Sequence, residues 1–500
     1  MSNTENLLTE ARKFFVDPKN PDAGIEVGWL AMQAAKAMSM IYAYGGDINR
    51  MPKYIQEQLN NQQLSGQVYP PLETTANEIL RREAGTRRFD HRFMGQIHPQ
   101  GSKIGILCNF IAAYMNTNTI VKDVSSSEHA MEHEVLDWCA KLFGYDPNNA
   151  SGNVVSGGTT ANIAAMWVAR EKTIKKLRQR NAYSRGQDMV IVGSDMKHYS
   201  VTKAGHMLGD NMLVATTKSC HLKTNTDDVE RILKICRDKH LNVAAIVGIA
   251  GETETGMIDD LNRLADLAEE YDTHFHVDAA YGGPFVLTDR AKNRFAGIER
   301  ADSITIDPHK LLFTPYPNGI ILFKNKNDHA LIQNGARYLQ HQGNNGLLGS
   351  KEERNFGLSA RVEGSMGTHG VLSAWGTIFG LGEERIRALL DHTIDLTQHA
   401  LTTVSGSEFA EVLHPLHIPE TNTLLLGINN SHKYPNNIAE EKALAIKDTL
   451  DRNGTYISVN ESIDKGRPAI RTVYMHPYTE KGDVDDMLYN LKEEIKKEFK

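Results

Sequence analysis

The sequence has little that would tie it to a membrane, a metal or a disulfide framework. Its 500 residues include four cysteines, with no CxxC pair and no metal-ligand spacing. No apolar run approaches the roughly 20 residues that cross a bilayer, and the N-terminus lacks the charged-then-apolar pattern of a signal peptide. The net charge of −7 argues against a nucleic-acid or membrane partner. We therefore expect a cytoplasmic protein with reduced thiols and no bound metal.

Helices and short apolar strands alternate through the centre of the chain. Helical stretches such as 259–272, with Asp259 or Asp260 as N-cap, separate the strand candidates 189–195, 211–217, 243–250, 274–280, 303–307 and 319–325. Continuously apolar strands are typical of a mostly parallel sheet with helices on both faces. We expect an α/β protein with a helical N-terminal segment (1–95), a large domain (96–385) and a smaller C-terminal α/β domain (386–500).

A glycine-rich turn precedes one of the expected helices, in SGGTTAN (156–162). Gly158 would let a ligand approach the backbone, and Thr159 adds a hydroxyl beside the free N–H groups of the helix N-terminus. The turn is neither a GxxxxGK[ST] loop nor a GxGxxG fingerprint, so it predicts a phosphate rather than a nucleotide. A plain helix start is the alternative interpretation.

Three other strand ends carry chemically useful side chains, and ligands of open α/β sheets bind at that edge. Asp278 precedes two alanines, so a flat ring could lie on Ala280 while the carboxylate holds a protonated ring nitrogen. His198 could stack on the opposite face of that ring. Lys310 follows His309 between apolar runs, where desolvation would make its amine a Schiff-base nucleophile. These are the parts that pyridoxal phosphate needs.

These positions and their flanking residues resemble the group II pyridoxal-phosphate-dependent amino-acid decarboxylases, which have the aspartate-aminotransferase-like fold (fold type I). The resemblance covers roughly residues 70 to 480 and rests on SGGTTAN, HYSVTKA (198–204), HVDAAYGGPF (276–285) and DPHKLLF (307–313). The stretch RVEGSMGTHGVLSAW (361–375) looks most like the bacterial tyrosine-decarboxylase branch. The resemblance implies an amino-acid substrate, which is decarboxylated to an amine, and a homodimer that the N-terminal segment clasps.

The resemblance also implies a role for each matching residue. Lys310 would form the Schiff base, Asp278 would pair with the ring nitrogen, and His198 would stack on the ring and help protonation. Cofactor contacts would also come from Gly158, Thr159, Thr253, Ala280 and His309. His98 and Arg471 would line the substrate pocket.

The sequence departs from the family pattern at several positions, and the segment 339–361 keeps other reactions open. Glu252 stands where many members have Thr, and the segment 339–361 has no Tyr to protonate the substrate carbon; Phe356 is its only aromatic residue, and Tyr338 lies just before it. We expect the proton to come from His198 or a partner chain. The alternatives are oxygen-dependent aldehyde synthesis, carbon–carbon cleavage and a catalytically inactive scaffold. Tyrosine or another aromatic substrate is favoured, with acidic and diamino acids as alternatives.

Overall fold

The computed structural model describes residues 3–13, 19, 90–120, 124–184, 186–209, 212–217, 219–334, 360–464 and 467–499. Within these ranges the chain forms a seven-stranded sheet, a four-stranded sheet and a short ribbon of β4 (Ser219–Cys220) and β5 (Lys223–Thr224). Most of the expected N-terminal segment, with its dimer clasp, lies outside the described residues. So do Tyr338, Phe356 and nearly all of the segment 339–361.

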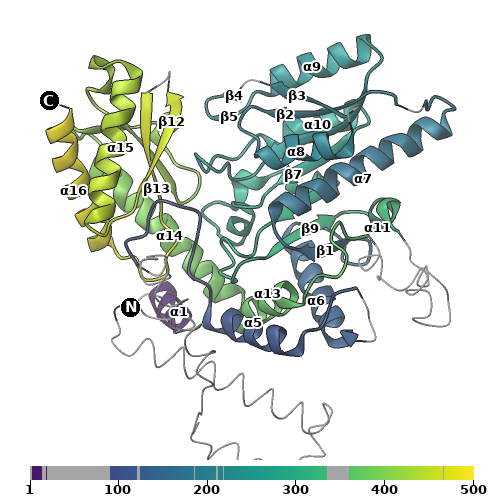
Figure 1. The fold of residues 1–500 in the computed structure, drawn as a ribbon, viewed down its shortest axis with the longest axis horizontal. Coiled ribbons are helices and arrows are strands. Elements are labelled where there is room, and N and C mark those ends of the chain that lie inside the picture. Colours follow the sequence, from purple (N-terminus) through teal and green to yellow (C-terminus); the bar gives the residue numbers. More distant parts are fainter. Residues whose placement is uncertain are drawn as a thin grey trace, which may run out of the picture.

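The large sheet confirms the expected mostly parallel α/β architecture (Figure 1). Its strands, in spatial order, are β1 (Ser151–Val155), β9 (Gly319–Phe323), β8 (Ser303–Ile306), β7 (His274–Asp278), β6 (Asn242–Ile249), β2 (Met189–Ser194) and β3 (Met212–Thr217). Strand β9 is antiparallel to both neighbours, and the other pairs are parallel. The carboxyl ends of β1, β2, β6, β7 and β8 therefore meet at one edge.

Helices cover both faces of this sheet because most of its strand residues are apolar and buried on both sides, while β7 and β8 carry polar side chains on one face. Alternate residues enter separate cores: Val154 and Ile320 pack on one face, and Val155 and Ile321 pack on the other. Helices α7 (Gly158–Gln179) and α8 (Tyr199–Leu208) cover the second face. The first core includes α6 (Ser126–Leu142), α9 (Thr226–Asp238), α10 (Leu261–Glu270) and α13 (His369–Leu381). Helix α5 (Lys103–Met115) packs on α13, and α11 (Lys326–His329) packs near β1.

The N-cap of α10 is Asp260, whose side chain accepts a hydrogen bond from the Arg263 backbone. Asp259, the other candidate, is instead buried, and it accepts hydrogen bonds from Thr224 and from the Ile249 backbone. Asp259 therefore ties the end of β6 to the β4–β5 ribbon.

The C-terminal part builds the second sheet, which is antiparallel. Its strands are β10 (Ala410–Val412), β11 (Thr423–Ile428), β13 (Arg467–Val473) and β12 (Ser458–Asp464), and its helices are α14 (Glu383–Val404), α15 (Asn436–Arg452) and α16 (Lys481–Glu498). Helix α1 (Asn3–Arg12) packs on α14. The domain limits at 95 and 385 stay predictions.

No helix among the described residues is long and apolar enough to cross a bilayer.

Candidate active site

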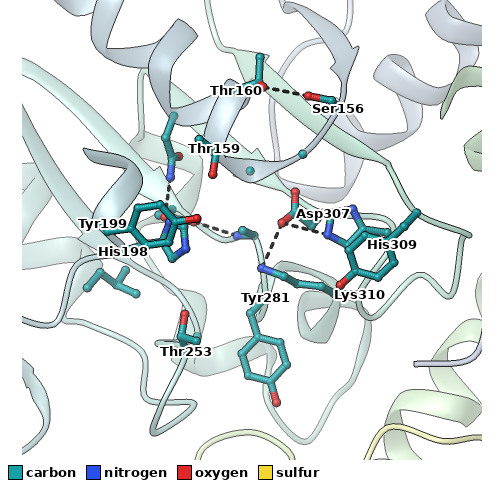
Figure 2. A pocket seen from close by; sticks show the side chains of 18 of the residues that line it. Ser156, Thr159, Thr160, His198, Tyr199, Thr253, Tyr281, Asp307, His309 and Lys310 are labelled. Atoms are coloured by element: carbon teal, nitrogen blue, oxygen red, sulfur yellow. Dashed lines mark hydrogen bonds and ion pairs between the residues drawn. The ribbon is translucent and has the colours of Figure 1, made fainter. Parts of the chain in front are cut away.

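Five strand ends surround one cavity of about 460 Å³ at the carboxyl edge of the large sheet (Figure 2). The segments after β1, β2, β6, β7 and β8 each contribute to its wall. The cavity is lined by Ser156, Gly157, Gly158, Thr159, Thr160, Asn162, Met196, His198, Tyr199, Ile249, Gly251, Thr253, Asp278, Ala280, Tyr281, Asp307, His309, Lys310 and Tyr316. All eight residues predicted to contact the cofactor are among them.

The glycine turn between β1 and α7 forms one end of the cavity. No side chain caps α7, a helix of 22 residues that starts at Gly158, so its first N–H groups and positive dipole end are available to an anion. A Cβ on Gly158 would lie 2.9 Å from Asp307 Oδ2 and 3.3 Å from the Ala280 side chain. Only glycine leaves this cradle open.

Lys310 reaches the centre of the cavity from the turn after β8. Its Nζ lies 3.0 Å from Asp307 Oδ2, and Figure 2 shows the amine directed at that carboxylate. His309 Nε2 lies 3.5 Å from the same oxygen. Burial lowers the pKa of His309 to about 4, so its imidazole is neutral at physiological pH. Its Nδ1 accepts a hydrogen bond from the Asn318 backbone at 3.1 Å, which leaves the proton on Nε2.

Asp278 ends β7 with its carboxylate held on both oxygens. Asn162 Nδ2 donates to Oδ2 at 2.7 Å, and the Ala280 backbone N–H donates to Oδ1 at 3.2 Å. The residue Asp278 is only 7% exposed. A buried carboxylate with fixed donors presents an acceptor of defined direction to a ligand in the cavity.

His198 is part of the cavity wall and is the N-cap residue of α8. Its Nδ1 accepts from the Ser200 backbone at 3.3 Å and lies 2.7 Å from Ser200 Oγ. Burial lowers its pKa, the Lys310 charge lowers it further, and Asp278 and Asp307 oppose them. The neutral ring therefore carries its proton on Nε2.

Two predicted substrate residues, His98 and Arg471, lie one contact behind the wall. His98 stacks on Tyr316, with ring centroids 4.7 Å apart and an angle of 15° between the rings. Arg471 donates to the backbone oxygens of Thr253 and Gly95, both at 2.9 Å. Arg471 thus supports Thr253 from behind, and direct contact of either residue with a substrate stays a prediction.

Sequence reasoning assigned no role to three residues of this wall: Asn162, Asp307 and Tyr316. Asn162 lies within SGGTTAN, one helical turn beyond Gly158, and this spacing could have indicated that both face the same edge. Asp307 lies three residues before Lys310, so a turn brings the two side chains together. Tyr316 had no comparable signal, because its ring reaches His309, at a centroid distance of 3.8 Å, only through the fold of its turn.

Comparisons with known proteins agree with this geometry. Residues 76–418 match the family described as the pyridoxal-dependent decarboxylase conserved domain. An aromatic-L-amino-acid decarboxylase of Bacillus atrophaeus is 26% identical over 81% of each chain. An aspartate 1-decarboxylase of Aliivibrio fischeri is 32% identical over 47% of each chain. The chain thus spans about four-fifths of the first relative and about half of the second.

Solved structures share the whole fold. The rice (Oryza sativa) TDC structure with PLP and tryptamine has a TM-score of 0.76 and 18% identity, and the match covers 97% of this chain and 100% of that one. The glutamate decarboxylase domain of a diaminobutyrate-pyruvate transaminase and L-2,4-diaminobutyrate decarboxylase from Vibrio parahaemolyticus has a TM-score of 0.72 and 21% identity, and the match covers 99% of this chain and 100% of that one. These likenesses confirm fold type I. Because the family match covers more than half of the sequence, the chain belongs to the pyridoxal-dependent decarboxylases and is a pyridoxal-phosphate-dependent amino-acid decarboxylase.

Proposed function

We propose that this enzyme decarboxylates an aromatic L-amino acid, with tyrosine as the first candidate, to the amine and CO₂. The observation that carries the proposal is the convergence of Lys310, Asp278 and the glycine turn of α7 on one cavity. When bound, pyridoxal phosphate supplies an electron sink for the charge left as the carboxylate departs.

The residues of the cavity fit that cofactor by their chemistry. The uncapped α7 N-terminus and the Thr159 hydroxyl would hold the phosphate, in a cradle that a Cβ on Gly158 would fill. Lys310 Nζ is the amine that would attach the aldehyde. The Asp278 carboxylate would accept the proton of the ring nitrogen, and His198 Nε2–H would supply a proton to the substrate.

The charges of the wall favour a neutral substrate side chain. Lys310 is the only Lys or Arg among the described lining residues, and attachment of the cofactor uses it. An acidic substrate needs a further cation for its side-chain carboxylate, and Arg471 already donates to two backbone oxygens. Tyr316, backed by His98 and His309, instead offers a flat surface to an aromatic ring.

Aldehyde synthesis is the second candidate. It is favoured by the segment 339–361, which contains no Tyr, and a fold neighbour from Rhodiola rosea is titled a 4-hydroxyphenylacetaldehyde synthase. Without a phenolic proton donor, the decarboxylated substrate would instead be oxidised by O₂ and hydrolysed, giving the aldehyde, ammonia and hydrogen peroxide in addition to CO₂. His198 is the competing donor, and its proton on Nε2 supports the simple decarboxylase.

One incubation series tests both candidates. The cofactor-loaded protein is given each of the twenty amino acids and 2,4-diaminobutyrate, with and without oxygen, and CO₂, amine, aldehyde and peroxide are followed. We expect equal amounts of CO₂ and amine from tyrosine, independent of oxygen. Aldehyde and peroxide that require oxygen would establish the second candidate, and turnover of aspartate or diaminobutyrate alone would refute the aromatic assignment.

A homodimer and a cytoplasmic location are part of the same proposal. The free thiols of Cys108, Cys139 and Cys236 support a reducing compartment. Light scattering should give twice the chain mass of 55.7 kDa, and a monomer that retains full activity would refute the dimer.

A further inference from the structure

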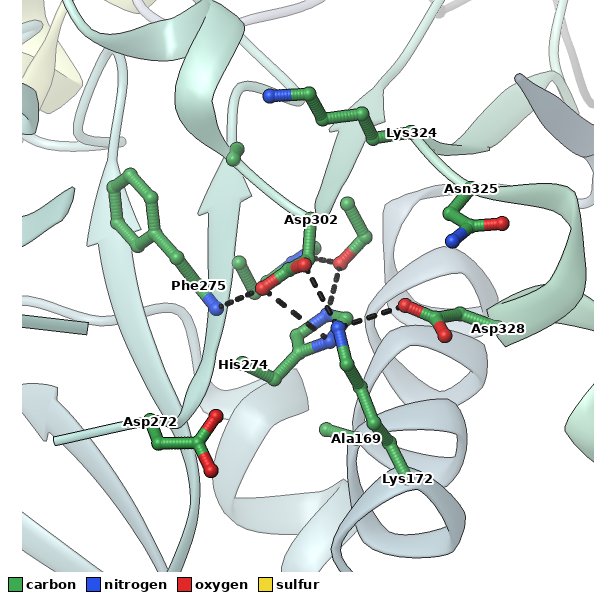
Figure 3. A network of polar contacts seen from close by, with 12 residues as sticks. Ala169, Lys172, Asp272, His274, Phe275, Asp302, Lys324, Asn325 and Asp328 are labelled. Atoms are coloured by element: carbon green, nitrogen blue, oxygen red, sulfur yellow. Dashed lines mark hydrogen bonds and ion pairs between the residues drawn. The ribbon is translucent and has the colours of Figure 1, made fainter. Parts of the chain in front are cut away.

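A buried line of polar side chains runs from Asp278 away from the cavity, beneath α7 (Figure 3 shows its far end). His274, His276 and Asp278 alternate along β7 and therefore share the face that α7 covers. Asn162, His276, Ser303 and His274 are each at most 1% exposed. Polar groups buried this deeply are costly unless every one is hydrogen-bonded in a consistent direction.

The direction of each hydrogen bond follows from the chemistry of the groups. Asp278 can only accept, so the amide of Asn162 must present its Nδ2–H to it, at 2.7 Å. Asn162 Oδ1 then faces His276 Nε2 at 2.9 Å, and it also accepts from the Thr305 hydroxyl at 2.7 Å. An amide oxygen accepts, so His276 carries its proton on Nε2.

The same logic continues along the line. Burial lowers the pKa of His276 to about 4, so the ring is neutral and its Nδ1 accepts from Ser303 Oγ at 2.9 Å. With its only hydrogen given to His276, Ser303 must accept from His274 Nε2, at 2.8 Å. His274 Nδ1 has no hydrogen-bond partner, as expected for the bare nitrogen of a neutral ring.

Charged groups close the far end of the line. Lys172 Nζ bridges Asp302 at 2.8 Å and Asp328 at 2.7 Å, and the Phe275 backbone N–H donates to Asp302 at 2.9 Å (Figure 3). His274 Nδ1 lies 3.8 Å from Asp302. These contacts hold β7 and β8 in place at the His274 end of the line.

Asn162 is also connected to His198 by hydrogen bonds through Ser200. Its second Nδ2 hydrogen is donated to Ser200 Oγ at 2.9 Å, and Ser200 Oγ lies 2.7 Å from His198 Nδ1. Asp278 and His198, the residues proposed to meet the ring nitrogen and one face of the ring, are therefore both connected to the amide group of Asn162.

We propose that Ser303 is a positioning residue of the active site, and that it acts through His276 and Asn162 to fix the direction in which Asp278 presents its carboxylate. All four hydrogen bonds from His274 to Asp278 are donated toward the cavity, so loss of the Ser303 hydroxyl breaks the line in the middle. The inference rests on the proposed function, in which Asp278 faces the ring nitrogen of the cofactor.

The test compares the binding of two cofactors, pyridoxal phosphate and its analogue with C–H in place of the ring nitrogen. Dissociation constants are measured by fluorescence for the wild type, Ser303→Ala and Ser151→Ala. Ser151 is the matched control, because it is a buried strand serine that lies 2.8 Å from Nδ1 of a buried histidine, His329, outside this line. Ser303→Thr, which keeps the hydroxyl, should behave as the wild type.

We expect Ser303→Ala to weaken binding of pyridoxal phosphate about fivefold to tenfold, the usual cost of one hydrogen bond, and to leave the analogue unaffected. Equal weakening of both ligands would mean a structural role only and would overturn the inference, as would no change. If the wild type binds both ligands equally, Asp278 does not meet the ring nitrogen, and the proposed site falls together with the inference.

A second readout needs no cofactor and no variant. Nitrogen-15 NMR of histidine-labelled, cofactor-free protein distinguishes the two neutral tautomers of an imidazole. The line requires that His274 and His276 both carry the proton on Nε2. A proton on Nδ1 of His276 would reverse the line and refute the inference even if Ser303→Ala failed to fold.

Discussion

Replacing Glu252 with Gln should remove a pH dependence of stability that the buried acid creates. Glu252 is 5% exposed, and its Oε2 accepts from Thr255 N at 2.8 Å, Thr255 Oγ1 at 2.9 Å and Glu254 N at 2.9 Å. Burial nevertheless outweighs these hydrogen bonds and raises the pKa of Glu252 from 4.5 to about 7. Gln keeps an acceptor oxygen of the same shape and cannot ionise.

The sign and size of the effect follow from linkage. The unfolded chain ionises Glu252 near pH 4.5 and the folded protein only near pH 7, so stability is lost as pH rises through this window. At 1.36 kcal/mol for each pKa unit, the full loss is about 3 kcal/mol. Gln at this position should therefore gain about 2 to 3 kcal/mol over the wild type between pH 5 and pH 8.

Urea unfolding of the cofactor-free protein, followed by tryptophan fluorescence at both pH values, measures this difference. Glu441→Gln, at an exposed position of α15, is the control and should shift stability equally at both pH values. Parallel pH profiles of the wild type and Glu252→Gln would refute the reasoning, because they would mean that Glu252 is ionised in the folded protein at pH 5.

Three further predictions concern the cradle, the lysine and a buried ion pair. Gly158→Ala should weaken cofactor binding at least tenfold, because its Cβ would meet Asp307 at 2.9 Å, whereas Gly482→Ala, with open space around it, should bind normally in the same titration. Borohydride reduction should attach the cofactor covalently to the peptide that contains Lys310, and the Lys310→Ala variant should show no labelled peptide. The control Lys197→Ala, which changes a half-buried lysine outside the cavity wall, should still be labelled. Arg361→Met should lower the unfolding free energy by about 3 to 5 kcal/mol, because it leaves the buried Glu132 carboxylate without its ion-pair partner; Arg361→Met combined with Glu132→Gln should recover part of that loss in urea unfolding.

Much of the fold was predictable because most central strands are short runs dominated by apolar residues between polar turns. The expected strands at 189–195 and 303–307 differ from β2 and β8 by one residue at the carboxyl end. Strand β1 was missed, since its sequence SGNVV contains glycine and asparagine, which are depleted in strands. Its burial comes from pairing with β9, a long-range contact that no local pattern contains.

The site likewise contains residues that the sequence identified and residues that it did not. Lys310, Asp278 and His198 were identifiable because they end strands that share an edge. Tyr316 was not, because its contact with His98 joins residues that are far apart in sequence. The orientation of Arg471 could not be predicted from the local sequence either. Its guanidinium donates to the backbone oxygens of Thr253 and Gly95, and only the folded structure brings these residues together.

The two histidines of β7 bear on why the active-site edge is built this way. Phe275 and Val277 pack into the core on the other face, so apolar residues at 274 and 276 would be the simple choice beneath α7. Imidazoles there must be desolvated, which lowers the pKa of His274 to about 3, and that cost brings no apolar packing in return. The imidazoles do supply hydrogen bonds that are donated, one after another, toward Asp278, and the buried Thr305 hydroxyl donates to the same Asn162 oxygen at 2.7 Å. A carboxylate that must direct a cofactor needs such a fixed donor behind it, and a hydrophobic residue at position 276 would remove one of the two described side-chain donors to the Asn162 oxygen, leaving Thr305.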